Sequence, residues 1–227
     1  MRDYNEFLRA LRGESGRAVL FEPFPGRKIV TQLIWRGGEH LWDTAEHYVS
    51  TLAEFYAYIK SDVVIAEARC RDIGELLSCR RLLPEGMRFV IIADDADSLA
   101  AADADASVCA LATASEAIGS YSKPLIYLCR GGDIGAEIDR AIGRGLAGIY
   151  LPDKIEEHSD ARGKIALLGG LGLERISSDE PMDIYRRVER LYREGGWIIG
   201  SGRIDDAAEN INYLGFISML GIYNKLI

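Results

Sequence analysis

The stretch KPLIYLCRGGDIGAEIDRAIGRGLAGIYLPD, residues 123–153, contains a complete strand–helix–strand unit. Two short apolar runs, 124–130 and 147–152, stand on either side of a helical pattern whose apolar residues are three and four positions apart. These residues form the inward stripe of the helix: Ile134, Ile138, Ala141 and Ile142. Two strands joined by one helix run parallel, and the crossover between them is right-handed.

The same alternation of short apolar runs with helical or polar segments extends over the whole chain. The runs are near-continuous rather than alternating, which is typical of parallel strands covered on both faces. They occupy residues 18–24, 62–68, 88–94, 106–113, 124–130, 147–152, 164–170 and 197–201. The clearest helices between them are expected at 41–60 and 182–194.

Eight such strands in 227 residues predict a single α/β domain over residues 1–227, folded as a (β/α)8 TIM-like barrel, for which about 250 residues is typical. An open doubly wound sheet is the alternative. Some crossovers are short: residues 96–105 leave little room for a full helix. The acidic stretch ADDADSLAAADADA, residues 93–106, lacks the spacing of a calcium loop and is predicted to be a solvated loop.

Composition narrows the class of protein. The formal net charge of −8 argues against a nucleic-acid or membrane-surface binder, because such proteins usually carry a basic face. The four cysteines form no C-x-x-C pair, and no apolar run reaches the ~18 residues of a membrane span. These features lead us to expect a cytoplasmic protein with reduced thiols.

In a barrel of this kind the active site lies at the carboxyl ends of the strands, where this chain places acids next to arginines. Such a rim suits a small anionic substrate, held by arginines and acted on by a carboxylate as acid or base. Pairing of these charges across the mouth is the alternative for each residue. The polar residues at or just after the strand ends include Glu22, Arg27, Glu67, Arg69, Asp94, Thr113, Ser115, Tyr127, Arg130, Tyr150, Ser201 and Arg203.

No cofactor or metal ion is expected from these residues. The three histidines lie in helical or loop context rather than at strand ends, and Cys129 is a lone cysteine on a strand. No P-loop or dinucleotide fingerprint follows a strand. Glycines near residues 169–172 and 200–202 allow either backbone turning or the close approach of a ligand.

Several segments in order resemble the uroporphyrinogen decarboxylase superfamily, which also contains cobamide-dependent methyltransferases. They are FLRALRGE at 7–14, SDVVIAEA at 61–68, the opening stretch at 123–153, KIALLGGLG at 164–172, and the closing segment EPMDIYRRVERLYREGGWIIGSGRIDDAAENINYL at 180–214. The resemblance covers most of the chain and implies a TIM-like barrel. It also implies a decarboxylase or methyltransferase chemistry on a tetrapyrrole or corrinoid-linked substrate.

The residues carried over from this family match only in part. Of the arginine pair that holds substrate carboxylates after strand one, Arg27 is present and Pro23 stands at the other position. The family's histidine after strand eight is replaced within Gly200–Arg203. The zinc-binding His-x-Cys on strand five is Tyr127-Leu128-Cys129 here, and Ser201 stands near the position of a further cysteine ligand.

The resulting hypothesis is an enzyme, a carboxy-lyase or a methyltransferase of this superfamily, acting on an acidic small molecule or a corrinoid-linked substrate. The alternative is a barrel that binds a corrinoid, a tetrapyrrole or a protein without turnover. An apolar face that includes Tyr192 and Tyr213 predicts a homodimer, with core packing as the alternative. The predicted catalytic residues are Glu67, Thr113 and Ser115, and the predicted substrate-binding residues are Arg27, Arg69, Tyr127, Arg130, Ser201 and Arg203.

Overall fold

A computed structural model gives the architecture of the chain. It describes residues 3–23, 25–34, 39–67, 71–103, 109–112, 123–129, 131–172 and 181–201, and the statements below concern these residues.

All eight predicted strands are present and form one parallel sheet. Their order is β1-β8-β7-β6-β5-β4-β3-β2, so each strand from β2 to β8 lies beside its neighbour in the sequence and β1 lies beside β8. This order has no reversal point, which a doubly wound sheet requires. The strands are β1 (Val19–Leu20), β2 (Val63–Glu67), β3 (Arg88–Ala93), β4 (Cys109–Ala112), β5 (Leu125–Leu128), β6 (Gly148–Leu151), β7 (Ala166–Gly170) and β8 (Ile198–Gly200).

Helical elements connect most of the strands in the described residues, and two of them differ from the sequence prediction. The expected helix at 41–60 is divided into η1 and α3 at Thr44, whose side chain caps α3 by accepting a hydrogen bond from His47 N–H. The stretch predicted to be a solvated loop contains the eight-residue helix α5, so that prediction was wrong there. Asp95 starts this helix, because its carboxylate accepts the Ser98 N–H at 2.7 Å.

The bounds of the helical elements are α1 (Tyr4–Leu11), α2 (Arg27–Leu33), η1 (Glu39–Trp42), α3 (Ala45–Tyr58), α4 (Ile73–Ser78), η3 (Cys79–Leu82), α5 (Ala96–Asp103), α6 (Ile134–Gly143), η5 (Ile155–Ala161) and α8 (Pro181–Glu194).

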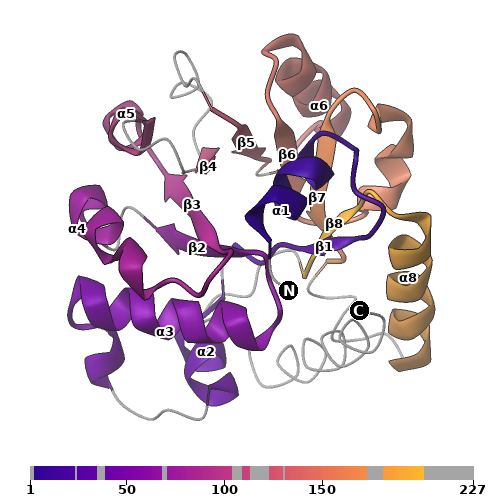
Figure 1. Ribbon diagram of the computed structural model, residues 1–227. Coiled ribbons are helices and arrows are strands. Elements are labelled where there is room, and N and C mark those ends of the chain that lie inside the picture. The colour runs from indigo at the N-terminus through magenta and orange to yellow at the C-terminus, as the bar shows by residue number, and fades with distance from the viewer. Residues whose placement is uncertain are drawn as a thin grey trace.

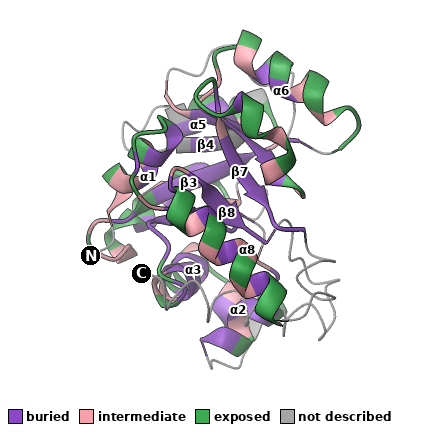
Figure 2. Ribbon diagram, turned by 90° about the vertical axis from the view of Figure 1, so that its right-hand side faces the viewer, coloured by how far each residue is buried: buried purple, intermediate pink, exposed green. Residues whose placement is uncertain are grey.

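The strands lie around a common centre with the labelled helices outside them, and α1 crosses the middle of the view in Figure 1. Figure 2 shows the strands almost uniformly buried and the helices exposed on their outer sides. A row of aromatic rings connects α1 with the strands. Phe7 of α1 stacks on Phe21 at 5.5 Å between ring centroids, and Phe21 contacts Tyr150 of β6 at 5.9 Å.

Between β1 and β2 the described residues show no backbone ladder, and side chains take its place. Val19 and Phe21 donate their N–H groups to the carbonyls of Trp197 and Ile199 on one side of β1. The alternate residues Leu20 and Glu22 therefore present their carbonyls on the opposite side, toward β2. Ser61 Oγ donates to the Val63 carbonyl of β2 at 2.9 Å and lies 3.4 Å from the Leu20 carbonyl oxygen, so it bridges the two strands. Tyr56 Oη donates to the Glu22 carbonyl at 2.7 Å.

Two further contacts complete this seam, the name used below for the β1–β2 boundary. Tyr48 Oη accepts the Glu67 N–H at 3.1 Å, and Arg17 pairs with Asp62 at 2.7 Å. Buried backbone groups without hydrogen-bond partners are costly. Helix α3 stabilises the sheet because its tyrosine hydroxyls bond to backbone groups that would otherwise need a neighbouring strand.

The Tyr56→Phe variant tests this role of the seam. Removal of the hydroxyl leaves the Glu22 carbonyl buried without its donor, and we expect the free energy of unfolding to fall by about 1–3 kcal/mol. Urea denaturation measures the change. Tyr58→Phe is the matched control on the same helix, because Tyr58 is 53% exposed, and it should leave stability nearly unchanged. Equal effects of the two substitutions would contradict the assignment.

Candidate functional site

A buried carboxyl group lies at the carboxyl ends of β1 and β8. Both of its oxygens are held by Ser201: the Ser201 N–H donates to Glu22 Oε2 at 2.9 Å, and Ser201 Oγ donates to Glu22 Oε1 at 2.7 Å. Glu22 and Ser201 are both fully buried. Leu20 pairs with Ile199 in the β1–β8 register, and Glu22 and Ser201 each lie two residues further along. The parallel pairing therefore places these two residues side by side.

The environment makes Glu22 a proton donor or acceptor suited to neutral pH. Burial raises the pKa of Glu22 to about 7, and the two hydrogen bonds from Ser201 partly offset this effect. A carboxyl group with a pKa near 7 exchanges protons at the pH of the cell, as general acid–base catalysis requires. Burial and the nearby Glu22 charge also raise the pKa of Tyr56, so this phenol stays protonated.

Tyr150 brings a fourth polar side chain, after those of Glu22, Ser201 and Tyr56, to this end of the sheet. A Cβ atom at Gly200 would lie 2.3 Å from the Phe21 carbonyl oxygen and 3.3 Å from the Tyr150 hydroxyl, so only glycine permits this approach of β8 to β1 and β6. We call Glu22, Tyr56, Tyr150 and Ser201 the mouth cluster. It combines one ionisable carboxyl with three hydroxyls at the end of the sheet where α/β barrels bind their substrates.

The glycines at the end of β7 allow close packing against residues 151 and 155. Gly169 and Gly170 have positive φ angles of 91° and 80°. A Cβ on Gly169 would lie 2.4 Å from the Leu151 carbonyl oxygen, and one on Gly170 would lie 2.3 Å from Ile155 Cβ. Of the two sequence-based interpretations, backbone turning therefore applies here, and the space that a ligand would need is filled by protein atoms.

Two of the predicted site residues lie at or beside the mouth cluster. Ser201 is a member of it. Glu67 ends β2, and its charge acts on the Tyr56 phenol, so its side chain lies within electrostatic reach of the cluster. Arg27 opens α2 and lies over the Trp42 ring, with its Cζ atom 5.3 Å from the ring centroid.

Tyr127 lies on the other face of the sheet. It shares a strand face with Leu125 and packs against the main hydrophobic core, to which Ile138 and Ala141 of α6 belong. Burial and the charge of Glu137 on α6 raise its pKa. Tyr127 therefore points to the helix layer and not to the mouth cluster. The remaining predicted residues lie outside the described part of the chain: Arg69, Thr113, Ser115, Arg130 and Arg203.

Sequence reasoning named Glu22 as a strand-end residue but did not select it for the site, and it did not select Tyr56 or Tyr150. A signal was available for Glu22, since it is an acid directly after an apolar run, in the place where a buried charge needs a partner. Tyr56 gave no such signal. Its spacing on α3 indicates only a buried helix face, and its hydroxyl acquires its role through the seam.

The zinc site that the sequence resemblance implies does not fit the described residues. They contain no group of three histidine, cysteine or acidic side chains able to hold a metal ion. Cys129 is buried, and burial raises the pKa of its thiol, which opposes the thiolate form that zinc requires. It also lies two residues after Tyr127, on the same face of the strand.

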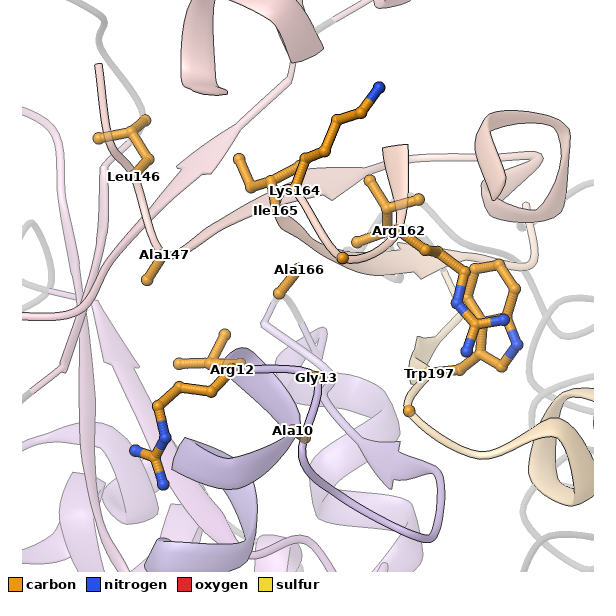
Figure 3. Close-up of a pocket in the computed structure, with 14 residues that line it drawn as sticks. Ala10, Arg12, Gly13, Leu146, Ala147, Arg162, Lys164, Ile165, Ala166 and Trp197 are labelled. Carbon is orange, nitrogen blue, oxygen red and sulfur yellow. The ribbon is translucent and has the colours of Figure 1, made fainter. Parts of the chain in front are cut away.

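A cavity of about 530 Å³ opens at the opposite end of the sheet, before the first residues of β6, β7 and β8. Figure 3 shows Ala10, Ala147 and Ala166 around it, with Arg12 and Lys164 pointing in different directions. Arg162 lies flat on the Trp197 ring, 4.2 Å from its centroid, and donates to the Gly195 carbonyl. The polar groups that line this cavity do not converge on one point, so we do not place the active site there.

No helix in the described ranges combines the length and the apolar character that crossing a bilayer requires.

The fold and site define an α/β protein with a parallel eight-stranded sheet and a polar cluster at its carboxyl edge. No protein-family model and no curated protein sequence matches the chain. Among solved structures, a methyltransferase from Methanosarcina mazei is similar over 97% of this chain and 97% of its own, with a TM-score of 0.65 and 8% sequence identity. At this identity the similarity establishes the fold alone, and any reaction has to be argued from the residues of the site.

The raised pKa of Glu22 predicts a characteristic pH dependence of stability. Between pH 4.5 and about 7 the folded protein keeps the Glu22 proton while the unfolded chain loses it, so the contribution of Glu22 to stability falls as the pH rises. Over this interval the loss amounts to at most about 3 kcal/mol, and it stays constant at higher pH.

The Glu22→Gln variant removes this titration while an amide can keep both contacts with Ser201. We therefore expect the difference in unfolding free energy between variant and wild type to shift in favour of the variant from pH 5 to pH 8, measured by urea denaturation at each pH. Glu67→Gln is the control at a strand end. A difference that stays flat with pH would show that the pKa of Glu22 is not raised.

Gly200→Ala tests the close approach of the strands at the mouth. The added methyl would meet the Phe21 carbonyl, and we expect a loss of about 2 kcal/mol or more in unfolding free energy. Gly143→Ala in α6 is the matched control, because nothing lies within 4 Å of the methyl group that this substitution adds and alanine favours helix. Thermal denaturation compares the two, and equal stability of both variants would refute the packing role of Gly200.

Proposed function

We propose that this chain is an enzyme of the uroporphyrinogen decarboxylase superfamily that acts on a small anionic molecule at the carboxyl ends of its strands. The observation that carries the proposal is the fully buried Glu22 carboxyl, with a pKa of about 7, held by Ser201 at this edge of the sheet. The proposal includes closure of the sheet into a (β/α)8 barrel across the β1–β2 seam, a single domain over residues 1–227, and a cytoplasmic location.

Among the chemistries of the superfamily, decarboxylation suits this site better than zinc-dependent methyl transfer, since the described residues do not supply the zinc ligands. In the proposed step the bond between the substrate carbon and its carboxylate breaks, and carbon dioxide leaves. The protonated Glu22 gives its proton to the carbanion, and solvent restores that proton afterwards. Ser201 is a positioning residue, because its two hydrogen bonds fix the orientation of the carboxyl group.

The other predicted residues keep supporting roles in this proposal. Glu67 provides a second carboxylate near Tyr56 and remains a candidate acid or base. Thr113 and Ser115 remain candidate catalytic hydroxyls. Arginines hold the substrate carboxylates, and those predicted for this role are Arg27, Arg69, Arg130 and Arg203. Tyr127 lies apart from this site, and a homodimer remains a prediction.

Assays on purified wild-type protein and on Glu22→Gln test the proposal. The substrates are uroporphyrinogen and a set of small di- and tricarboxylates, with released carbon dioxide as the readout. We expect turnover that falls above pH 7, where Glu22 loses its proton, and a loss of at least about 100-fold in kcat for the variant. Release of carbon dioxide that is equal in the two proteins would rule out the role of Glu22, and no release from any substrate would overturn decarboxylation.

A second function is favoured by one observation: Glu22 has no exposed surface, and both of its oxygens already have partners. These features also suit a barrel that binds a tetrapyrrole or corrinoid without turnover, with Glu22 as a structural group. Absorbance titration with uroporphyrin and hydroxocobalamin separates the two functions. Saturable binding without any product from the assays above would support the binding protein.

A further inference from the structure

Two arginines without acid partners among the described residues meet at one tryptophan beside the seam. Most arginines of these residues pair with carboxylates, for example Arg187 with Glu156 at 2.5 Å and Arg140 with Glu137 at 2.6 Å. Arg27 and Arg71 form no such pair within the described ranges. Arg27 lies over the Trp42 ring at 5.3 Å, and Arg71 donates from Nη2 to the Trp42 carbonyl.

Arg71 carries the clearest sign of a missing partner. Its Nε atom is buried and has no hydrogen-bond acceptor among the described residues. A buried donor of a charged group left in this state is costly, and an oxyanion that accepts from it would offset that cost. The guanidinium fork is shaped for two parallel hydrogen bonds to a carboxylate or a phosphate.

Among the described residues, the nearby acids do not supply this anion. Asp72 is the nearest in sequence, and its carboxylate caps α4 by accepting the Glu75 N–H at 3.1 Å. Glu46 pairs with Arg81. Arg27 is exposed and Arg71 is partly exposed, so both cations border solvent in a chain whose net charge is −8.

A continuous series of contacts joins these arginines to the mouth cluster. The Trp42 ring lies 5.9 Å from the Tyr48 ring, and the Tyr48 hydroxyl accepts the Glu67 N–H. From the same helix Tyr56 bonds the Glu22 carbonyl. An anion bound at the arginines would therefore lie on the side of the mouth where β1 and β2 end.

We infer that Arg71 and Arg27, set against Trp42, form a binding site for the oxyanion group of a small molecule, a carboxylate or a phosphate. The inference deepens the proposed function by naming the residues that anchor the substrate, and it rests on that function for its biological meaning. Arg71 was not among the residues selected from the sequence. It is the principal contact, because its buried Nε has no acceptor among the described residues, while Arg27 adds charge over the Trp42 ring.

Binding is measured on the full chain with succinate and inorganic phosphate as separate probes at constant ionic strength. Calorimetry gives the affinity, and the arginine Nε–H resonances in nitrogen-15 spectra show which side chain responds. We expect saturable binding of at least one probe with a shift of the Arg71 resonance. A stronger response to succinate identifies a carboxylate ligand, and a stronger response to phosphate identifies a phosphate ester.

Arg71→Lys keeps the charge and removes the fork, and we expect it to weaken binding about tenfold or more. Arg27→Gln should weaken binding to a smaller degree. Arg81→Lys is the matched control, because Arg81 is exposed and paired with Glu46, and its affinity should equal that of the wild type. No binding of either probe, or equal affinities in the Arg71 and Arg81 variants, would overturn the inference.

The Glu22→Gln variant separates this inference from the proposed function. It should bind the probes with wild-type affinity, since Glu22 does not contact the arginines. Anion binding without any turnover would leave the site standing and remove the proposed reaction. Turnover that depends on Glu22, together with no effect of Arg71→Lys on binding, would support the proposed reaction and remove the anion site.

Discussion

The structure depends on how the two end strands of its sheet satisfy their backbone groups. A parallel sheet of eight strands leaves the outer sides of β1 and β2 without a ladder among the described residues, and unpaired groups there would be buried. Hydroxyls of Ser61, Tyr56 and Tyr48 contact these backbone groups in place of a ladder, and Arg17 with Asp62 adds an ion pair. Helix α3 is therefore both the cover of these strands and part of their hydrogen bonding.

The same arrangement brings the chemistry together. The carbonyl of Glu22 accepts from Tyr56 at the seam, whereas its side chain turns to Ser201 across the β1–β8 boundary. Glu22 thus links β1 to α3 on one side and to the end of β8 on the other. Burial between these two elements raises the pKa of the Glu22 carboxyl to about 7. The packing that keeps water from the strand end therefore also provides a proton donor at neutral pH.

Sequence patterns predicted the elements well and the site only in part. Near-continuous apolar runs sufficed for all eight strands, because a strand covered on both faces has few places for polar residues. The acidic segment before β4 misled the prediction, because its aspartates are typical of a loop whereas Asp95 caps a short helix. The pattern placed Tyr127 at the mouth because it ends a strand, but the pleat turns it toward α6.

By itself, the sequence determined which segments are strands and helices and that polar residues follow the strands, since these depend on local periodicity and on neighbours a few positions away. The tertiary structure alone decided which of these residues meet. Glu22 and Ser201 are 179 positions apart, and only the return of β8 to lie beside β1 joins them. The raised pKa, the tyrosine-bonded seam and the placement of Arg71 against Trp42 all result from contacts between distant segments, which no local pattern records.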